Sequence, residues 1–373
     1  MKIQEKRWQE LDTYYMELQG DIDLDNYLSP ANRAQELEIF REKVLSGHMY
    51  NPQFIYDPVP DVRENELKKY LKGLNLKNPV EKIYADAVRY RLDEINAARE
   101  HTGETVTNLT TMMFGKPDQT LLEIAVKNLK TGKGDQRAYN GQQEGKIYNA
   151  QELAQLCRDA MTGYGFNWKV VVKPEMGNKA AVDNIIREFW IRADVKFHES
   201  LVKMMIVHEI GTHILRSENG YAQPLKIFGT GLPSYQFTEE GLAEYAEEQC
   251  GVLMDSTVYR ISGRVIGVNK ALEGSFWETY CSVKDYFDLD MAFDIAQRAK
   301  LGIADTNQPG AYTKDYTYLA GLIKVREFFN TAAKSQTDAL FAGKLGFQHL
   351  ETVQSLQKAG YLKKPKAYPE WWS

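Results

Sequence analysis

Two histidines and a glutamate in the segment LVKMMIVHEIGTHILR (201–216) have types and spacing that suit metal-dependent hydrolysis. The chain has only six histidines among 373 residues, so this spacing arises by chance in on the order of 1% of such compositions. His208 and His213 plus one carboxylate would leave the fourth tetrahedral position of Zn²⁺ open for water. Zinc lowers the pKa of bound water toward about 7. Glu209 is placed to accept the proton of that water and then to protonate the leaving amine.

The HExxxH spacing is one residue longer than the familiar HExxH of zinc peptidases. Positions i and i+4 are separated by about 40° around an α-helix, whereas positions i and i+5 are separated by about 140°. A regular helix therefore could not direct both imidazoles to one ion. A π-bulge adds a residue to one turn and is frequent at functional sites, and Gly211 permits a distorted backbone. We predict an irregular turn at 209–212.

A third ligand is expected on the helix predicted for QFTEEGLAEYAEE (236–248). The candidate ligands there are Glu239, Glu240 and Glu244. We choose Glu240 because it begins an ExxA pattern, in which the small Ala243 would let this helix approach the HExxxH helix. Thr238 is expected to cap the start of the helix. Glu244, one turn beyond Glu240, is expected to support a ligand by hydrogen bonding or to be the alternative ligand.

A purely structural explanation of these residues is the alternative to a metal site. A buried histidine is more often a hydrogen-bonded core residue than a ligand, and an acidic helix is often a solvated surface. The pair His198–Glu199 has no second histidine, because Lys203 occupies that position. The HExxxH pattern within an apolar helix, followed by EExxA after one loop, favours a metal site.

The elements around these residues predict an α+β, mainly helical fold. Residues 1–145 are predicted to form an N-terminal helical region, and residues 146–373 a zincin-like metallopeptidase domain with a small β-sheet. Apolar residues at helical spacing occur in the N-terminal region at 3–18, 37–44, 80–91 and 121–129. Ser29 is expected to cap the second of these helices.

The boundary between the two regions is predicted within the glycine-rich stretch TGKGDQRAYNGQQEGKIY (131–148). A helix over 150–162, capped by Asn149 with Glu152, should follow it. Runs of β-branched and aromatic residues then predict strands at 168–173 and 187–195.

Composition excludes several functional classes. The chain has 46 basic and 51 acidic residues, a net charge of −5, so it has no overall positive field and nucleic acid is not expected as a partner. Its three cysteines include no CxxC, which argues against a disulfide framework or a thiolate zinc site. The first residues are charged and no run of 18 apolar residues occurs, so we expect a cytoplasmic protein without a membrane partner.

Three segments resemble the HExxxH metallopeptidase family that contains the vertebrate tubulin tyrosine carboxypeptidases and the bacterial flavohaemoglobin expression-modulating QEGLA-motif proteins. They are HEIGTHILR (208–216), TEEGLA (238–243) and RAKLGIADTNQPGAYTKDYTYLAG (298–321). The resemblance implies one zinc ion per chain, held by His208, His213 and Glu240, with Glu209 as the catalytic base. It implies hydrolysis of the C-terminal peptide bond of a peptide or protein, with release of an aromatic residue such as tyrosine or phenylalanine. It does not imply tubulin as the substrate.

A carboxypeptidase also needs cations for the terminal carboxylate and donors for the tetrahedral oxyanion. The candidates for the carboxylate are Arg192, Arg216, Arg298 and Lys314. Tyr318 is the candidate donor to the oxyanion. The strand at 187–195 is expected to be an exposed sheet edge that pairs with the substrate backbone. The aromatic tail AYPEWWS (367–373) is expected to dock Trp371 and Trp372 on the body of the protein.

Two other functions remain open at this point. The HExxxH pattern specifies how water is activated but not which end of a peptide is cleaved, so an endopeptidase or aminopeptidase is the first alternative. The second is a regulatory binding protein whose metal site is idle, although the presence of Glu209 argues against it.

Overall fold

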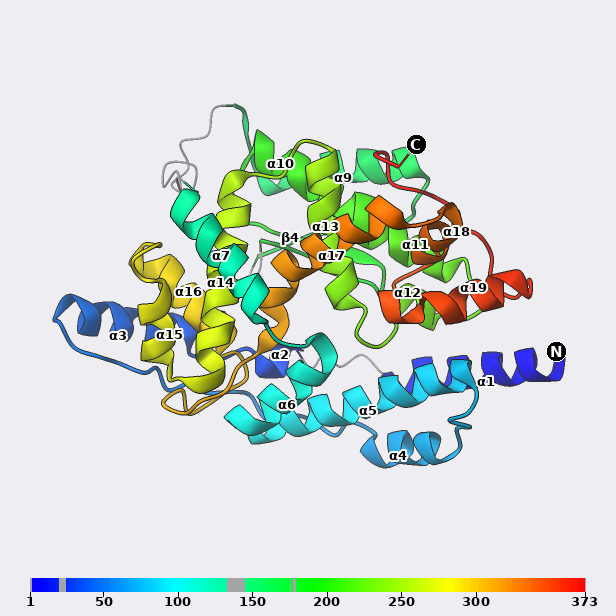
Figure 1. The fold of residues 1–373 in the computed structure, drawn as a ribbon, viewed down its shortest axis with the longest axis horizontal. Coiled ribbons are helices and arrows are strands. Elements are labelled where there is room, and N and C mark those ends of the chain that lie inside the picture. Colours follow the sequence, from blue (N-terminus) through cyan, green and yellow to red (C-terminus); the bar gives the residue numbers. More distant parts are fainter. Residues whose placement is uncertain (1, 20–24, 133–144, 175, 177–178, 373) are drawn as a thin grey trace. The chain divides into compact units, whose positions relative to one another are not determined.

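The structure of the chain is a computed structural model, which describes residues 2–19, 25–132, 145–174, 176 and 179–372 (Figure 1). Helices dominate the described chain, and its strands form a two-stranded and a three-stranded sheet. The predicted α+β, mainly helical class is confirmed. Most of the predicted joint at 131–148 lies outside the described residues. None of the described helices is both long and apolar enough to cross a membrane.

Internal packing divides the chain into two compact units. Unit 1 draws on Met1–Thr13, Asp135–Ser256 and Gly321–Ser373, and unit 2 on Tyr14–Gly134 and Thr257–Ala320. This division differs from a single boundary at 145–146, because residues 257–320 pack with the N-terminal helices. Sequence patterns identify elements one after another and do not reveal which distant segments pack together.

Unit 2 is helical. Its elements are α2 (Asp25–Leu28), α3 (Arg33–Leu45), α4 (Glu64–Lys72), α5 (Pro79–Glu100), α6 (Gly103–Phe114), α7 (Gln119–Thr131), most of α14 (Asp255–Glu273), α15 (Phe276–Val283), α16 (Leu289–Ala299) and the 3₁₀ helix η2 (Thr313–Tyr316). Two further helices, α1 (Lys2–Gln19) and α17 (Thr317–Thr331), contribute residues to both units. Ser29 does not cap α3, which follows Asn32 and begins at Arg33.

An aromatic core holds part of unit 2 together. Phe40 of α3 is fully buried, and its ring lies edge-on to Phe276, Tyr280 and Phe293 at centroid distances of 5.5, 4.9 and 5.1 Å. Edge-to-face pairs of this kind are favourable beyond the area that they bury. The contacts join α3 to α15 and α16, although these helices are far apart in the sequence.

Unit 1 packs helices against a small sheet. Its helices are α9 (Ala150–Tyr164), α10 (Glu199–Met205), η1 (Ile206–Ile214), α11 (Leu215–Tyr221), α12 (Ile227–Thr230), α13 (Gln236–Gln249), α18 (Lys334–Leu340), η3 (Phe347–His349) and α19 (Leu350–Lys358). The predicted capping box at the start of α9 is confirmed: Asn149 Oδ1 accepts from the Glu152 backbone N–H at 3.0 Å, and Glu152 accepts from Asn149 N–H at 2.9 Å. The helix ends at Tyr164, and the residue that caps its C-terminus, Gly165, has a left-handed backbone.

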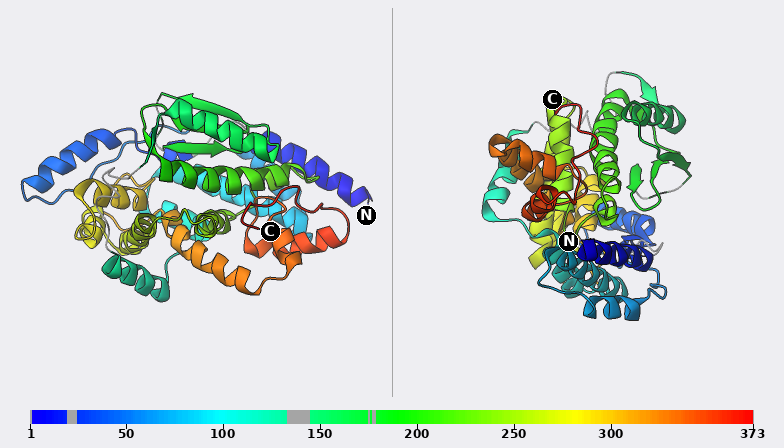
Figure 2. Two further views of the ribbon diagram at one scale, coloured as in Figure 1. Left: turned by 90° about the horizontal axis from the view of Figure 1, so that it is seen from above. Right: turned by 90° about the vertical axis from the view of Figure 1, so that its right-hand side faces the viewer.

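The three-stranded sheet has the order β2–β4–β3 and packs against α9 and, through β3, against η1 (Figure 2). Its strands are β2 (Lys169–Lys173), β3 (Ala180–Asp183) and β4 (Glu188–Arg192). β4 pairs in parallel with β2 and antiparallel with β3. The strand predicted at 187–195 is therefore the central strand, and the expectation that it is an exposed edge is wrong. A separate pair joins β1 (Ile147–Tyr148) to β5 (Phe197–His198).

The C-terminal tail docks on unit 1, as predicted. Trp371 lies 5.3 Å from the ring of Tyr245 and 5.4 Å from that of Phe329, and Trp372 lies 5.3 Å from Phe329. The buried Asn219 of α11 accepts hydrogen bonds from the backbone N–H of Ala367, at the start of the tail, and from that of the preceding Lys366. The tail therefore braces the helix that continues directly from η1.

Candidate metal centre

The HExxxH residues lie on η1, a π-helical segment that joins α10 to α11. Backbone hydrogen bonds of a π-helix join residues five apart, so His208 and His213 are brought to one face. The Thr212 hydroxyl follows the same spacing and donates to the Val207 carbonyl at 3.3 Å. The predicted irregular turn at 209–212 is confirmed, and the distortion extends over nine residues.

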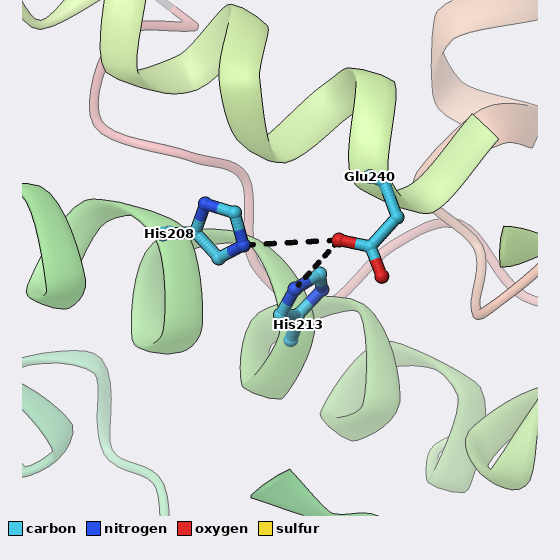
Figure 3. Close-up of side chains that lie close together, drawn as sticks. All are labelled: His208, His213 and Glu240. Carbon is cyan, nitrogen blue, oxygen red and sulfur yellow. Dashed lines mark ion pairs between the residues drawn. The ribbon is translucent and has the colours of Figure 1, made fainter. Parts of the chain in front are cut away.

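Glu240 joins the two histidines from α13, which packs along η1. Its Oε2 lies 3.8 Å from His208 Nε2 and 3.8 Å from His213 Nε2, and Figure 3 shows both imidazoles beside this carboxylate. The three side chains offer ligand atoms that all lie within 4.8 Å of one another. Ligands around tetrahedral Zn²⁺, at about 2.0–2.2 Å from the ion, are roughly 3.3–3.6 Å apart. A small contraction would therefore fit these atoms to the ion.

The other nitrogen of each imidazole is hydrogen-bonded to a carboxylate of α13. His208 Nδ1 lies 2.7 Å from Glu247 Oε1, and His213 Nδ1 lies 2.9 Å from Glu239 Oε1. An ionised carboxylate only accepts hydrogen bonds, so each neutral imidazole would carry its proton on Nδ1. Each Nε2 then keeps its lone pair for a metal, which is how carboxylates orient histidine ligands in zinc sites.

Glu239 is the buried acceptor for two cations as well as for His213. Arg216 forms an ion pair with it, and Lys344 Nζ lies 2.8 Å from Glu239 Oε1. Burial alone would raise the pKa of Glu239, but the charges of Arg216 and Lys344 and the His213 hydrogen bond hold it well below its usual range. Glu239 is therefore ionised and fixed in place, and it lies behind His213 as an orienting group.

The surroundings of His208 favour a positive charge. Burial acts to lower the pKa of His208, but the hydrogen bond to Glu247 and the charges of Glu247, Glu209 and Glu244 raise it to about 10. A divalent cation on Nε2 would supply this positive charge without a proton. The chemistry of the donor set and the charge around it thus fit Zn²⁺.

Glu244 belongs to a second group of metal-ligating side chains. His208, Glu244 and Glu247 also have ligand atoms within 4.8 Å of one another, and both glutamates are buried. This group contains only one imidazole, whose Nδ1 already bonds Glu247. The group of His208, His213 and Glu240 is the better candidate for zinc, because it offers two imidazole nitrogens.

Glu209 follows His208 on η1 and is partly exposed. Its charge also acts on Cys157 of α9, and burial together with Glu209 raises the pKa of this thiol to about 12. Cys157 is therefore a neutral thiol. The cysteines of the described chain are all free.

Close backbone packing fixes α13 within unit 1. A Cβ on Gly241 would lie 2.3 Å from the backbone carbon of Gly321, so glycine permits α13 to approach α17. Thr238 does not cap α13, which begins two residues earlier at Gln236. Its hydroxyl accepts a hydrogen bond from the Phe347 N–H at 3.1 Å instead.

The residues predicted to bind the substrate carboxylate lie in different surroundings. Arg216 is fully buried and donates to Glu239 and to the carbonyls of Leu340 and Leu345. It therefore has no surface for a substrate carboxylate, and its role is to hold Glu239. Arg192 on β4 pairs with Asp194 at 2.7 Å.

The remaining candidates belong to unit 2. Arg298 of α16 donates to Asp315, Lys314 lies on η2, and the ring of Tyr318 lies 5.4 Å from the Arg264 guanidinium carbon. Their roles toward substrate stay predictions.

The sequence patterns predict Glu239 only as a candidate ligand and predict no role for Glu247. A usable signal for Glu247 was present, since Glu240, Glu244 and Glu247 follow the i, i+4, i+7 spacing of one helix face. A row of carboxylates facing two histidines supplies both a ligand and a hydrogen-bond acceptor for an imidazole.

The fold and this site define a mainly helical α+β protein with a histidine–carboxylate candidate metal centre on a π-helix. Residues 40–373 match the model of the family described as "Microtubule-associated tyrosine carboxypeptidase". The chain belongs to this family, which confirms the resemblance recognised in its motifs.

Individual relatives share moderate identity with the chain. A rat protein named microtubule-associated tyrosine carboxypeptidase 1 is 27% identical over 350 residues, which cover 91% of this chain and 63% of that protein. The mouse protein of the same name is 27% identical over 346 residues, covering 90% and 62%. A human protein named putative tyrosine carboxypeptidase MATCAP2 is 30% identical over 175 residues, covering 45% and 32%. The chain thus spans less than two thirds of the length of these relatives.

Proposed function

We propose that this chain is a zinc-dependent metallocarboxypeptidase that hydrolyses the C-terminal peptide bond of a peptide or protein and releases an aromatic residue. One observation carries the proposal. The Nε2 atoms of His208 and His213 both lie 3.8 Å from one Glu240 oxygen, while both Nδ1 atoms are held by carboxylates. The names of the relatives support cleavage at the C-terminus and tyrosine as the released residue.

Zinc, when bound, would supply Lewis-acid chemistry by polarising the scissile carbonyl and lowering the pKa of a water molecule. Glu209 would accept the proton of the attacking water and deliver it to the nitrogen of the leaving residue. Glu239 and Glu247 would keep both imidazoles in the Nδ1–H tautomer.

The substrate backbone needs a partner other than β4, which is paired on both sides. β3 is an outer strand of the same sheet and packs against η1. We propose that the peptide pairs with the outer edge of β3 (Ala180–Asp183), where main-chain hydrogen bonds would hold it without regard to its sequence. Tubulin is not required by this proposal.

Product analysis by mass spectrometry tests the proposal. Peptides ending in tyrosine would be supplied with a free C-terminus, an amidated C-terminus or an acetylated N-terminus. The expected result is loss of one residue from the free C-terminus whether or not the N-terminus is acetylated, and no cleavage of the amide. Cleavage inside the peptides, or dependence on a free N-terminus, would favour an endopeptidase or an aminopeptidase.

A matched pair of variants links cleavage to the site. Glu209→Gln should abolish cleavage, whereas Glu199→Gln removes the glutamate of the other His–Glu pair, which lies on the surface with Lys203, and should leave it unchanged. An idle metal site in a regulatory protein would show no cleavage even in the unaltered chain.

A further inference from the structure

A second cluster of charged side chains lies within unit 2, around the buried Asp315 of η2. Arg298 of α16 donates to both carboxylate oxygens of Asp315, from Nε at 2.5 Å and from Nη2 at 2.7 Å. Arg264 of α14 brings a second guanidinium to the same carboxylate, with its Nε 3.4 Å from Asp315 Oδ2. One carboxylate is therefore shared by two arginines.

Arg264 is the member of the cluster whose hydrogen bonding is incomplete. Its residue is only 8% exposed, and its Nε is buried without a hydrogen-bond acceptor in the described part of the chain. The contact of Arg264 Nε with Asp315 is thus an ion pair without a hydrogen bond. A buried guanidinium with an unsatisfied donor is costly unless another acceptor completes it.

The charges around Arg264 are unbalanced in favour of an anion. Burial lowers the pKa of its guanidinium, and the like charges of Arg298 and Arg260 lower it further, while Asp315 and, to a smaller extent, Tyr318 act to raise it. Lys314, next to Asp315 in the chain, adds another positive charge that acts on this carboxylate. An oxyanion would therefore be attracted to this place by charge and by an available donor.

The cluster is both reachable and rigid. The side chain of Arg298 is 30% exposed, whereas those of Arg264 and Asp315 are 9% and 4% exposed, so solvent reaches the cluster on the Arg298 side. The buried Lys300, two residues after Arg298, donates to four backbone carbonyls of the surrounding loops, at residues 271, 274, 308 and 310. These bonds fix the segment that leads to Asp315.

We infer that Arg264 and Arg298 form a binding site for a carboxylate-type oxyanion. In this site the ligand accepts the hydrogen bond for which Arg264 Nε has no acceptor in the described chain. The planar fork of arginine suits the two oxygens of such a ligand. The oxyanion could be the terminal carboxylate of a peptide, an identification that rests on the proposed function, or a free inorganic anion. Arg264 was not singled out from the sequence.

Binding measurements on the full chain test the site without any cleavage step. N-acetyl-L-tyrosine, N-acetyl-L-tyrosinamide and sulfate would be titrated by calorimetry into the unaltered chain and into Arg264→Gln, before and after treatment with a chelator. Lys270→Gln is the matched control, because it removes one positive charge from the same helix and its side chain is 42% exposed.

The unaltered chain and Lys270→Gln should bind the acid with or without chelator, and Arg264→Gln should bind it at least about tenfold more weakly. The tyrosinamide, which lacks the carboxylate, should not bind at this site. Sulfate that fails to displace the acid would assign the site to a peptide carboxylate, and sulfate that binds equally would assign it to small oxyanions in general.

Equal binding of the acid by Arg264→Gln and the unaltered chain would overturn the inference, as would failure of both anions to bind. If Arg264→Gln does not fold, Arg264→Lys keeps the charge but loses the planar fork, and unchanged binding by that variant would also overturn it. These measurements need neither metal nor cleavage. Absence of anion binding would therefore not contradict the proposed peptidase activity, and absence of cleavage would not contradict the anion site.

Discussion

Replacing Glu239 or Glu247 by glutamine should separate the orientation of a histidine from the stabilisation of the fold. Both carboxylates accept a hydrogen bond from Nδ1 of a candidate zinc ligand, at 2.9 and 2.7 Å. Glu239 also pairs with the buried cations Arg216 and Lys344. In the described chain, Glu247 forms an ion pair only with His208.

The expected magnitudes differ for that reason. Glu239→Gln would leave two buried cations without their counter-charge, which should lower the free energy of unfolding by about 3–5 kcal/mol. Glu247→Gln removes the counter-charge of no lysine or arginine in the described chain. The second oxygen of Glu247 is buried there without a hydrogen-bond partner. The substitution should therefore cost less than about 2 kcal/mol. Both variants should bind zinc about 10–100-fold more weakly, because each loosens one imidazole.

Two assays would measure these effects independently. Urea unfolding of the metal-free chain gives the free energy of unfolding, and competition with a chromogenic chelator gives the zinc affinity. Glu248→Gln is the control on the same helix, because Glu248 is partly exposed and pairs with Arg326. The reasoning is refuted if Glu239→Gln is as stable as the unaltered chain, or if Glu247→Gln keeps its full zinc affinity.

Two further predictions concern stability. Burial opposes ionisation of Asp315, but Arg264 and Arg298 hold its pKa well below the usual range. The ionised Asp315 therefore contributes to the free energy of unfolding above its unfolded pKa of about 4, and this contribution is lost as the pH falls below that value. Asp315→Asn should be less stable by about 3–5 kcal/mol at pH 7 and should lose less stability than the unaltered chain between about pH 5 and pH 2; parallel curves from urea unfolding would contradict this. Gly211→Ala should cost less than about 1 kcal/mol, because a Cβ there meets nothing closer than 3.7 Å. Gly241→Ala should cost about 2 kcal/mol or more, since its Cβ would lie 2.3 Å from Gly321; equal melting temperatures of the two variants would disprove the contrast.

The features that the sequence predicted well are those determined by nearby residues. The geometry of HExxxH demands a distorted turn, and the structure has a π-helix there. The capping box of Asn149 and Glu152 is likewise a contact between residues three apart. Gly211 permits a distorted backbone there, and its surroundings would also accommodate a methyl group.

The features that escaped prediction depend on contacts between distant segments. β3 has only four residues and a weak pattern of its own, yet it makes β4 a central strand. The type of Arg216 and its position near the zinc ligands predict a residue that binds the substrate carboxylate. The partners of Arg216, Glu239 and the carbonyls of Leu340 and Leu345, come from segments that no local pattern connects to it.

The measurement that tests the account most directly is the zinc content of the purified chain by elemental analysis. The account predicts one zinc ion per chain, retained in Glu209→Gln and in the control His198→Ala, whose histidine lies outside the centre, and lost in His213→Ala. A chain that takes up no zinc, or a His213→Ala variant that holds it as tightly as the unaltered chain, would contradict the assignment of His208, His213 and Glu240 as the metal centre.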